Sequence, residues 1–128
     1  MLLRKFMSLV GVGSAKIDLE LEKATFKAGE RIQGYYQLKG GVIDQQLKRI
    51  ECDLIKVDEE EVMEETIDSI TMLTTEVIET EEVDKIPFSF QLPAPLPSSS
   101  ERTSYYFKTR LFFTEGVESK DEDVIHII

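Results

Sequence analysis

The chain has 128 residues, 41% of them hydrophobic, and its 15 basic and 25 acidic residues give a net charge of −10. This size suits one domain with one core, because such a chain buries enough surface to fold without disulfides or metals. No apolar run approaches the ~20 residues of a membrane-spanning helix, and the negative charge repels a phosphate backbone, so a membrane span and a nucleic-acid partner are both disfavoured. The single cysteine, Cys52, cannot form an internal disulfide and fits a reducing compartment, which favours the cytoplasm.

Residues 1–14 are predicted to form an N-terminal arm. Its large apolar residues fall at helical spacing with Arg4, Lys5 and Ser8 opposite them, which favours a short amphipathic helix. A secretory signal is disfavoured because the apolar stretch is short and interrupted by glycine, and binding to a membrane surface is a weaker alternative. Because the glycines at 11 and 13 let the arm swing, we expect a C2 homodimer formed through the arm or through an unprotected sheet edge. The predicted partner-binding residues are Leu2, Leu3, Phe6, Met7, Leu9 and Val10.

Three strands are predicted in the first half of the remaining chain. Apolar and polar residues alternate over residues 17–21 and 32–38, with a turn at 27–30 between them. The third strand covers residues 47–57, where the apolar face changes near Leu54 and Ile55, so either both faces are partly covered or a β-bulge lies there. On this strand Cys52 is interpreted as a small core side chain, since no neighbour in the sequence lowers its pKa.

An acidic stretch follows, over residues 58–82. It contains 11 carboxylates and no Lys or Arg, which leaves 14 acids against 15 bases elsewhere in the chain. Its β-branched residues favour a strand, and its charge is typical of solvated segments. A divalent-cation site is the alternative, but neither this stretch nor residues 120–123 has the spacing of a calcium loop, so no metal ligand and no cofactor are predicted.

Residues 86–97 have the clearest pattern in the sequence. Four large apolar residues alternate there with other residues and are followed by three prolines. This pattern indicates a half-buried strand that leaves its sheet in an extended, proline-rich exit. A second alternation over residues 105–113 predicts another strand facing the same core. The predicted core residues are Ile86, Phe88, Phe90, Leu92, Tyr105, Phe107, Leu111 and Phe113.

The end of the chain is predicted to be a polar turn at residues 116–123 and a short strand at 124–128. His126 lies opposite the apolar face of that strand and is interpreted as a half-exposed structural residue, because zinc or a catalytic triad would need partners that the sequence does not offer. In all, about seven short strands with one apolar face each predict an all-β fold, an antiparallel β-sandwich over residues 15–128. The acidic stretch would protect one sheet edge with charge and leave other edges free to pair with another chain.

Several segments together resemble the bacterial sporulation-control protein family of bacilli, stage zero, letter M. They are residues 6–15, 17–19, 29–30, 34, 38–41 and above all 86–93, IPFSFQLP, whose arrangement is also similar to the N-terminal domains of the arrestin-like superfamily. The resemblance covers most of the chain and departs from the family in the acidic stretch. It implies an arrestin-like, immunoglobulin-like sandwich and a cytosolic regulatory protein that acts through protein contacts.

No catalytic residues are predicted, since no convergent set of titratable groups is visible in the sequence. A non-enzymatic regulatory or adaptor protein is therefore the expected function. The alternative is a secreted or surface-attached sandwich that binds cations or carbohydrate, which would account for the acidity.

Overall fold

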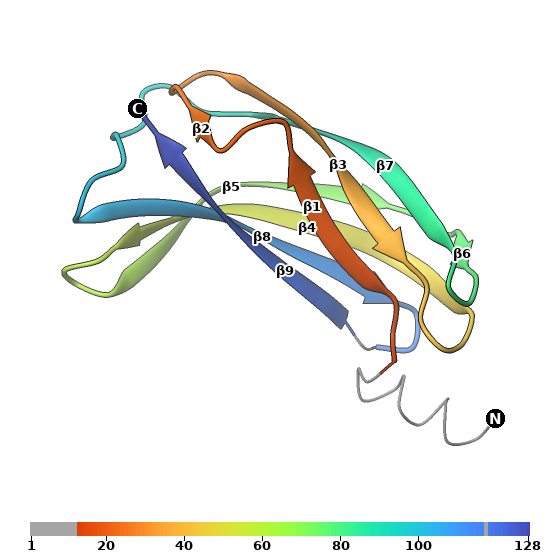
Figure 1. Ribbon diagram of the computed structural model, residues 1–128. Helices are drawn as coiled ribbons and strands as arrows, with labels where there is room; N and C mark the ends of the chain where they lie inside the picture. The colour runs from red at the N-terminus through yellow and green to blue at the C-terminus, as the bar shows by residue number, and fades with distance from the viewer. Residues whose placement is uncertain (1–12, 117) are drawn as a thin grey trace.

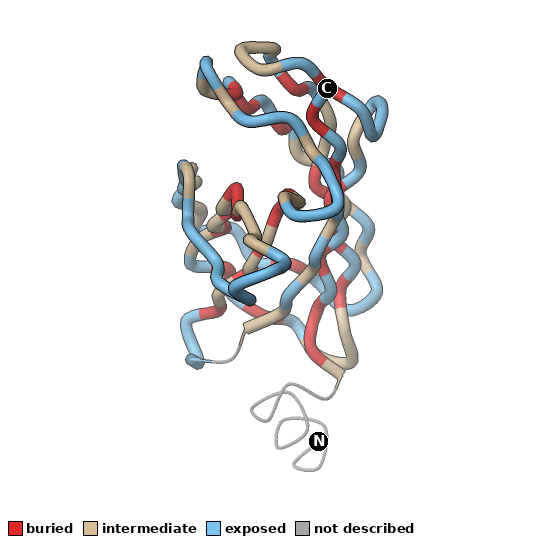
Figure 2. The backbone as a smooth tube through the Cα atoms, turned by 90° about the vertical axis from the view of Figure 1, so that its left-hand side faces the viewer, coloured by how far each residue is buried: buried red, intermediate tan, exposed pale blue. Residues whose placement is uncertain are grey.

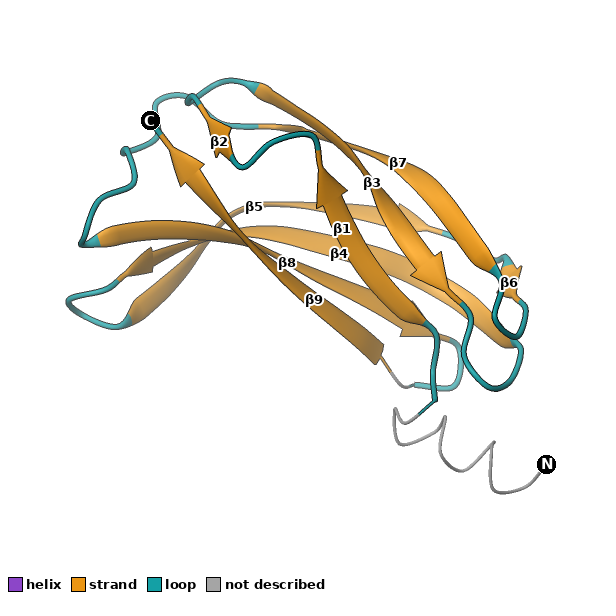
Figure 3. Cartoon of the chain, viewed as in Figure 1, coloured by secondary structure: helices purple, strands orange, loops and turns teal. Residues whose placement is uncertain are grey.

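The computed structural model describes residues 13–116 and 118–128. Within them the chain forms nine strands and no helix (Figure 3). The strands are β1 (Lys16–Leu21), β2 (Thr25–Phe26), β3 (Arg31–Lys39), β4 (Gln45–Asp58), β5 (Met63–Leu73), β6 (Val77–Ile78), β7 (Val83–Gln91), β8 (Thr103–Phe113) and β9 (Glu118–Ile127). Accordingly, none of the described residues belongs to a helix that could cross a membrane.

The strands form two stacked sheets (Figure 1). A three-stranded sheet has the order β1-β3-β7, and a six-stranded sheet has the order β2-β9-β8-β4-β5, with β6 also paired to β4. Most pairings are antiparallel, but β2 runs parallel to β9. The turn between β4 and β5 carries this hairpin beyond the end of the smaller sheet (Figure 1).

The core lies between the two sheets, and buried residues alternate with more exposed ones along most of the long strands (Figure 2). Phe88 and Phe90 of β7 meet Phe107 of β8 edge to face, with ring centroids 5.7 and 5.1 Å apart. Among the predicted core residues, Ile86 is partly buried against the cluster and the others are buried. The strand faces predicted for β7 and β8 are therefore confirmed.

The predicted irregularity in β4 is a β-bulge at the expected place. Leu54 pairs with Asp68 and Ile55 with Thr66, so the extra residue is Ile67 of β5. Leu54 and Ile55 are both buried although they are consecutive, which explains the change of apolar face seen in the sequence.

The polar turn predicted at residues 116–123 is wrong. Strand β9 begins at Glu118 and pairs with β8 along its whole charged half, where Glu118 lies opposite Phe112 and Asp123 opposite Phe107. Apolar alternation is absent here because Asp121 and Asp123 turn toward β1 and not into the apolar core. Only the end of the strand, at Ile125 and Ile127, reaches that core.

The two sheets are joined at one side of the sandwich. The backbone N–H of Leu19 in β1 donates to Asp121 Oδ2 in β9 at 2.8 Å, and the Ser119 hydroxyl donates to the carbonyl of Ala15. At the other side, β5 and β7 are the outer strands of their sheets. The sandwich is thus closed along β1 and β9 and has its free strand edges on β5 and β7.

Candidate interaction surface

The predicted partner-binding residues of the arm lie outside the described residues. They are Leu2, Leu3, Phe6, Met7, Leu9 and Val10, and their role stays a prediction. The described chain begins at Gly13, directly before β1.

A second candidate is the face of the six-stranded sheet that points away from the core, which we call the outer face. In β4, Ile50, Cys52 and Leu54 point into the core, so the residues between them point outward. Pairing then aligns side chains across β5, β4, β8 and β9. The rows are Leu73, Arg49, Phe112 and Glu118; Thr71, Glu51, Arg110 and Lys120; and Ser69, Asp53, Lys108 and Glu122.

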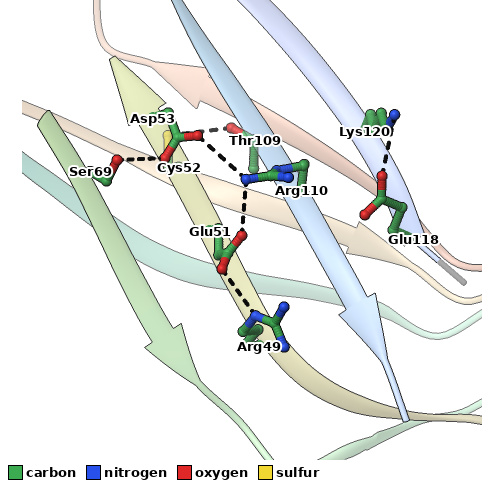
Figure 4. Close-up of polar contacts among 9 residues, drawn as sticks. All are labelled: Arg49, Glu51, Cys52, Asp53, Ser69, Thr109, Arg110, Glu118 and Lys120. Carbon is green, nitrogen blue, oxygen red and sulfur yellow. Dashed lines mark hydrogen bonds and ion pairs between the residues drawn. The ribbon is translucent and has the colours of Figure 1, made fainter. Parts of the chain in front are cut away.

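The middle of the outer face is an ordered network of ion pairs (Figure 4). Arg110 Nη2 lies 3.1 Å from Glu51 Oε2 and 3.5 Å from Asp53 Oδ2. The other Glu51 oxygen, Oε1, accepts from Arg49 Nε at 3.1 Å, and Asp53 Oδ1 accepts from the Ser69 hydroxyl at 2.6 Å. The side chains of Arg49, Glu51, Asp53 and Arg110 are only 17–30% exposed, so this network is shielded from water more than fully exposed surface pairs are.

Apolar side chains lie beside these charges. The ring of Phe112 is contacted by two guanidinium groups, with the Arg49 and Arg110 Cζ atoms 4.0 and 5.4 Å from its centroid. At the two sides of the face, Leu73 is 79% exposed and Val124 is 77% exposed. Mixed aromatic, arginine and aliphatic surface of this kind is enriched in protein interfaces.

The charge of the outer face differs from that of the whole chain. Its three rows contain four bases and four acids, whereas the chain has a net charge of −10. A partner at this face therefore meets paired charges and apolar groups, and no strong repulsion.

The single cysteine is a core residue, as the sequence indicated. Cys52 is fully buried on β4, its Sγ lies 3.4 Å from the Thr109 hydroxyl, and burial raises the pKa of its thiol to about 12. A thiol with such a pKa is not a nucleophile at neutral pH.

Three carboxylates that are distant in the sequence meet where β1 faces β9. One oxygen of each of Asp18, Asp121 and Asp123 lies within 4.8 Å of the others. Burial and a hydrogen bond to Asp121 raise the pKa of Asp123 to about 8, and a hydrogen bond to Glu20 together with burial raises the pKa of Asp18 to about 6. Asp123 and Asp18 therefore keep their protons to a higher pH than an ordinary aspartate does. The sequence did not reveal them, because their proximity depends on how the two sheets stack.

The family model described as SpoOM protein matches residues 3–128. A sporulation-control protein spo0M of Bacillus subtilis (strain 168) is 32% identical over 130 residues, which cover 97% of this chain and 50% of the relative. This chain thus spans about half the length of that relative.

Solved structures support the fold. The crystal structure of Spo0M from Bacillus subtilis matches with a TM-score of 0.80 and 30% identity, over 91% of this chain and 50% of that one. The match confirms the expected arrestin-like β-sandwich. An alkylpurine DNA glycosylase from Pseudomonas fluorescens, AlkC, matches with a TM-score of 0.56 at 12% identity, over 98% of this chain and 33% of that one, and shows likeness of fold alone.

Proposed function

The chain belongs to the SpoOM protein family of sporulation-control proteins, and we propose that it is a non-enzymatic, cytoplasmic regulatory protein that acts by binding other proteins. The observation that carries this proposal is the outer face. It combines a shielded Arg–carboxylate network with Phe112 and the exposed Leu73, and it is neutral in an acidic chain. The buried, high-pKa thiol of Cys52 agrees with a non-catalytic role in a reducing compartment.

Self-association is the second element of the proposal. Besides Met1, the arm contains six large apolar residues within its first ten positions, and these are costly to leave in water at roughly 25 cal/mol per Å². We expect this arm to pack on a second copy and form a C2 dimer.

Site-specific photo-crosslinking in sporulating Bacillus subtilis tests the protein-binding role. A crosslinking amino acid at the position of Lys120 probes the outer face, and one at the exposed position of Gln33 on the smaller sheet is the matched control. We expect discrete adducts with other proteins from the first position and not from the second. The same adducts from both positions would contradict the proposal, because they would report random encounters.

A further inference from the structure

The free edge of β5 has backbone groups that point away from the sheet. The N–H of Thr74 donates to the carbonyl of Lys48 in β4 at 3.2 Å. Backbone groups of neighbouring residues in an antiparallel strand point to opposite sides, and those of alternate residues point to the same side. Met72 and Ile70 therefore point toward β4, as Thr74 does. Ser69, Thr71 and Leu73 therefore direct their N–H and C=O groups to the free edge.

One of these outward backbone groups already has a hydrogen-bond partner. The N–H of Ser69 donates to the carboxylate of the preceding Asp68 at 2.9 Å. Along residues 69–73, β5 is bonded to β4 on one side, and within the described part of the chain no strand covers the other side. Thr71 and Leu73 are exposed, so their outward backbone groups are open to another strand.

The charge around this edge decides which strand can be added. Residues 58–82 hold 11 carboxylates and no Lys, Arg or His. A second copy paired edge to edge would bring no base from its own residues 58–82, so no register would place an opposite charge beside Asp68, Glu64 or Glu65. An extended segment with lysine or arginine would instead meet Asp68, Glu64 and Glu65 as opposite charges.

We propose that the free edge of β5 at residues 69–73 binds an extended, basic segment of a partner protein by β-strand addition. The flanking acidic side chains favour a basic segment over a second copy, and the backbone groups of Thr71 and Leu73 supply the hydrogen bonds. This inference rests on the proposed protein-binding function and names the kind of partner segment.

The test uses the full chain and a blocked heptapeptide of alternating lysine and valine. Titration is followed by calorimetry and by NMR shifts of backbone amides. We expect shifts centred on residues 69–73 and no binding of the matched peptide with glutamate in place of lysine. Thr71→Pro removes one outward N–H without touching the β4 ladder, and Thr71→Val keeps it, so only the proline variant should lose affinity, by roughly tenfold.

Peptides methylated on backbone nitrogen give a measurement that does not depend on the folding of a variant. Methylation of one set of alternate residues should abolish binding, and methylation of the other set should not, because only one set faces β5. Equal binding of both methylated peptides, or shifts spread over the acidic turn at 59–62, would show ionic attraction alone and overturn the proposal. The crosslinking result at Lys120 is independent of this edge, so failure here leaves the protein-binding function to its own test.

Discussion

The ring of Phe90 on β7 meets the ring of Phe107 on β8 edge to face, with centroids 5.1 Å apart and planes at 75°. Each residue belongs to a different sheet and each is almost completely buried. This pair therefore makes a direct contact between the two sheets. Aromatic pairs of this geometry stabilise a fold by more than the burial of their apolar surface alone.

Phe90→Ala should lower the free energy of unfolding by roughly 3–5 kcal/mol, because it leaves a cavity between the sheets. Phe112→Ala is the matched control, since that ring lies on the outer face and its removal opens no cavity in the core. Urea unfolding measures both variants. A Phe90→Ala protein within about 1 kcal/mol of the parent would mean that the sheets do not pack through this ring.

The carboxylate cluster between β1 and β9 predicts that stability falls as the pH rises. Asp123 has a folded-state pKa of about 8 against an ordinary value of 3.8, so the folded protein holds a proton that the unfolded chain has lost. That contribution is fully present below pH ~4 and disappears as the pH passes through ~8. The urea midpoint should therefore decline from pH 5 to pH 9, and Asp123→Asn should flatten the decline.

Glu122→Gln is the control for the pH series, because it removes one charge from an exposed neighbouring position. If the urea midpoint of this variant also declines less with pH, the cause of the decline is general charge repulsion and not the carboxylate cluster. Calcium supplies a further check. An ion held by Asp18, Asp121 and Asp123 would raise the thermal midpoint, and such a rise would contradict a proton held by Asp123 and support the cation-binding alternative.

Asp58, the last residue of β4, differs from the acids that follow it in the turn to β5. Asp58 Oδ1 accepts from the N–H groups of Glu60 and Glu61, and its Oδ2 lies 3.2 Å from Arg102 Nη2. The hydrogen bond to Arg102 lowers the pKa of Asp58. Asp58→Ala should therefore lower the urea midpoint at pH 7, with the difference lost as the pH falls below ~4, where the carboxyl is protonated. Glu61→Ala should leave the midpoint unchanged, and equal loss in both variants would contradict a specific role for Asp58.

Val62 in the same turn has a φ of 53° and is 83% exposed. A β-branched residue is strained in this left-handed conformation, which asparagine adopts more readily. Val62→Asn should raise the free energy of unfolding by about 1 kcal/mol. Val77→Asn, at an exposed position in β6, is the control, and a stabilisation of equal size there would point to reduced surface hydrophobicity as the cause.

Removal of residues 1–12 should convert the proposed dimer to a monomer, because it deletes the apolar arm. Light scattering over a concentration series measures the mass of both chains. If parent and truncated chains have the same mass at every concentration, the arm has no role in assembly, and binding to anionic vesicles becomes the next measurement.

Much of the sandwich was predictable because one face of most strands is apolar. Phe88, Phe90 and Phe107 alternate with polar residues, and this period of two fixes both the strand and the face that it buries. The end of β9 was predicted as a strand, but its first half was not, since Asp121 and Asp123 lie near Asp18 of β1 instead of in the apolar core. Its pattern over residues 118–123 therefore looks like a polar turn.

The outer face was harder to foresee. Arg49, Glu51 and Asp53 alternate with core residues in β4, and that alternation marks them as outward-facing. Arg110, which pairs with Glu51 and Asp53, lies more than fifty residues later in the chain, and the contact depends on the register of β4 with β8. Register is set by long-range pairing, which no local pattern records.

The order of pairing along the chain has a consequence for how the protein folds. Strand β3 pairs with β7, and Arg31 lies opposite Gln91. The chain between these two strands contains β4, β5 and β6, so the pairing closes a long loop. Closing such a loop is slow compared with forming the β4–β5 hairpin, and unpaired edges stay exposed during the delay. The 11 carboxylates of residues 58–82 lie within this loop. Mutual repulsion between half-folded chains should then keep them from aggregating until the smaller sheet closes.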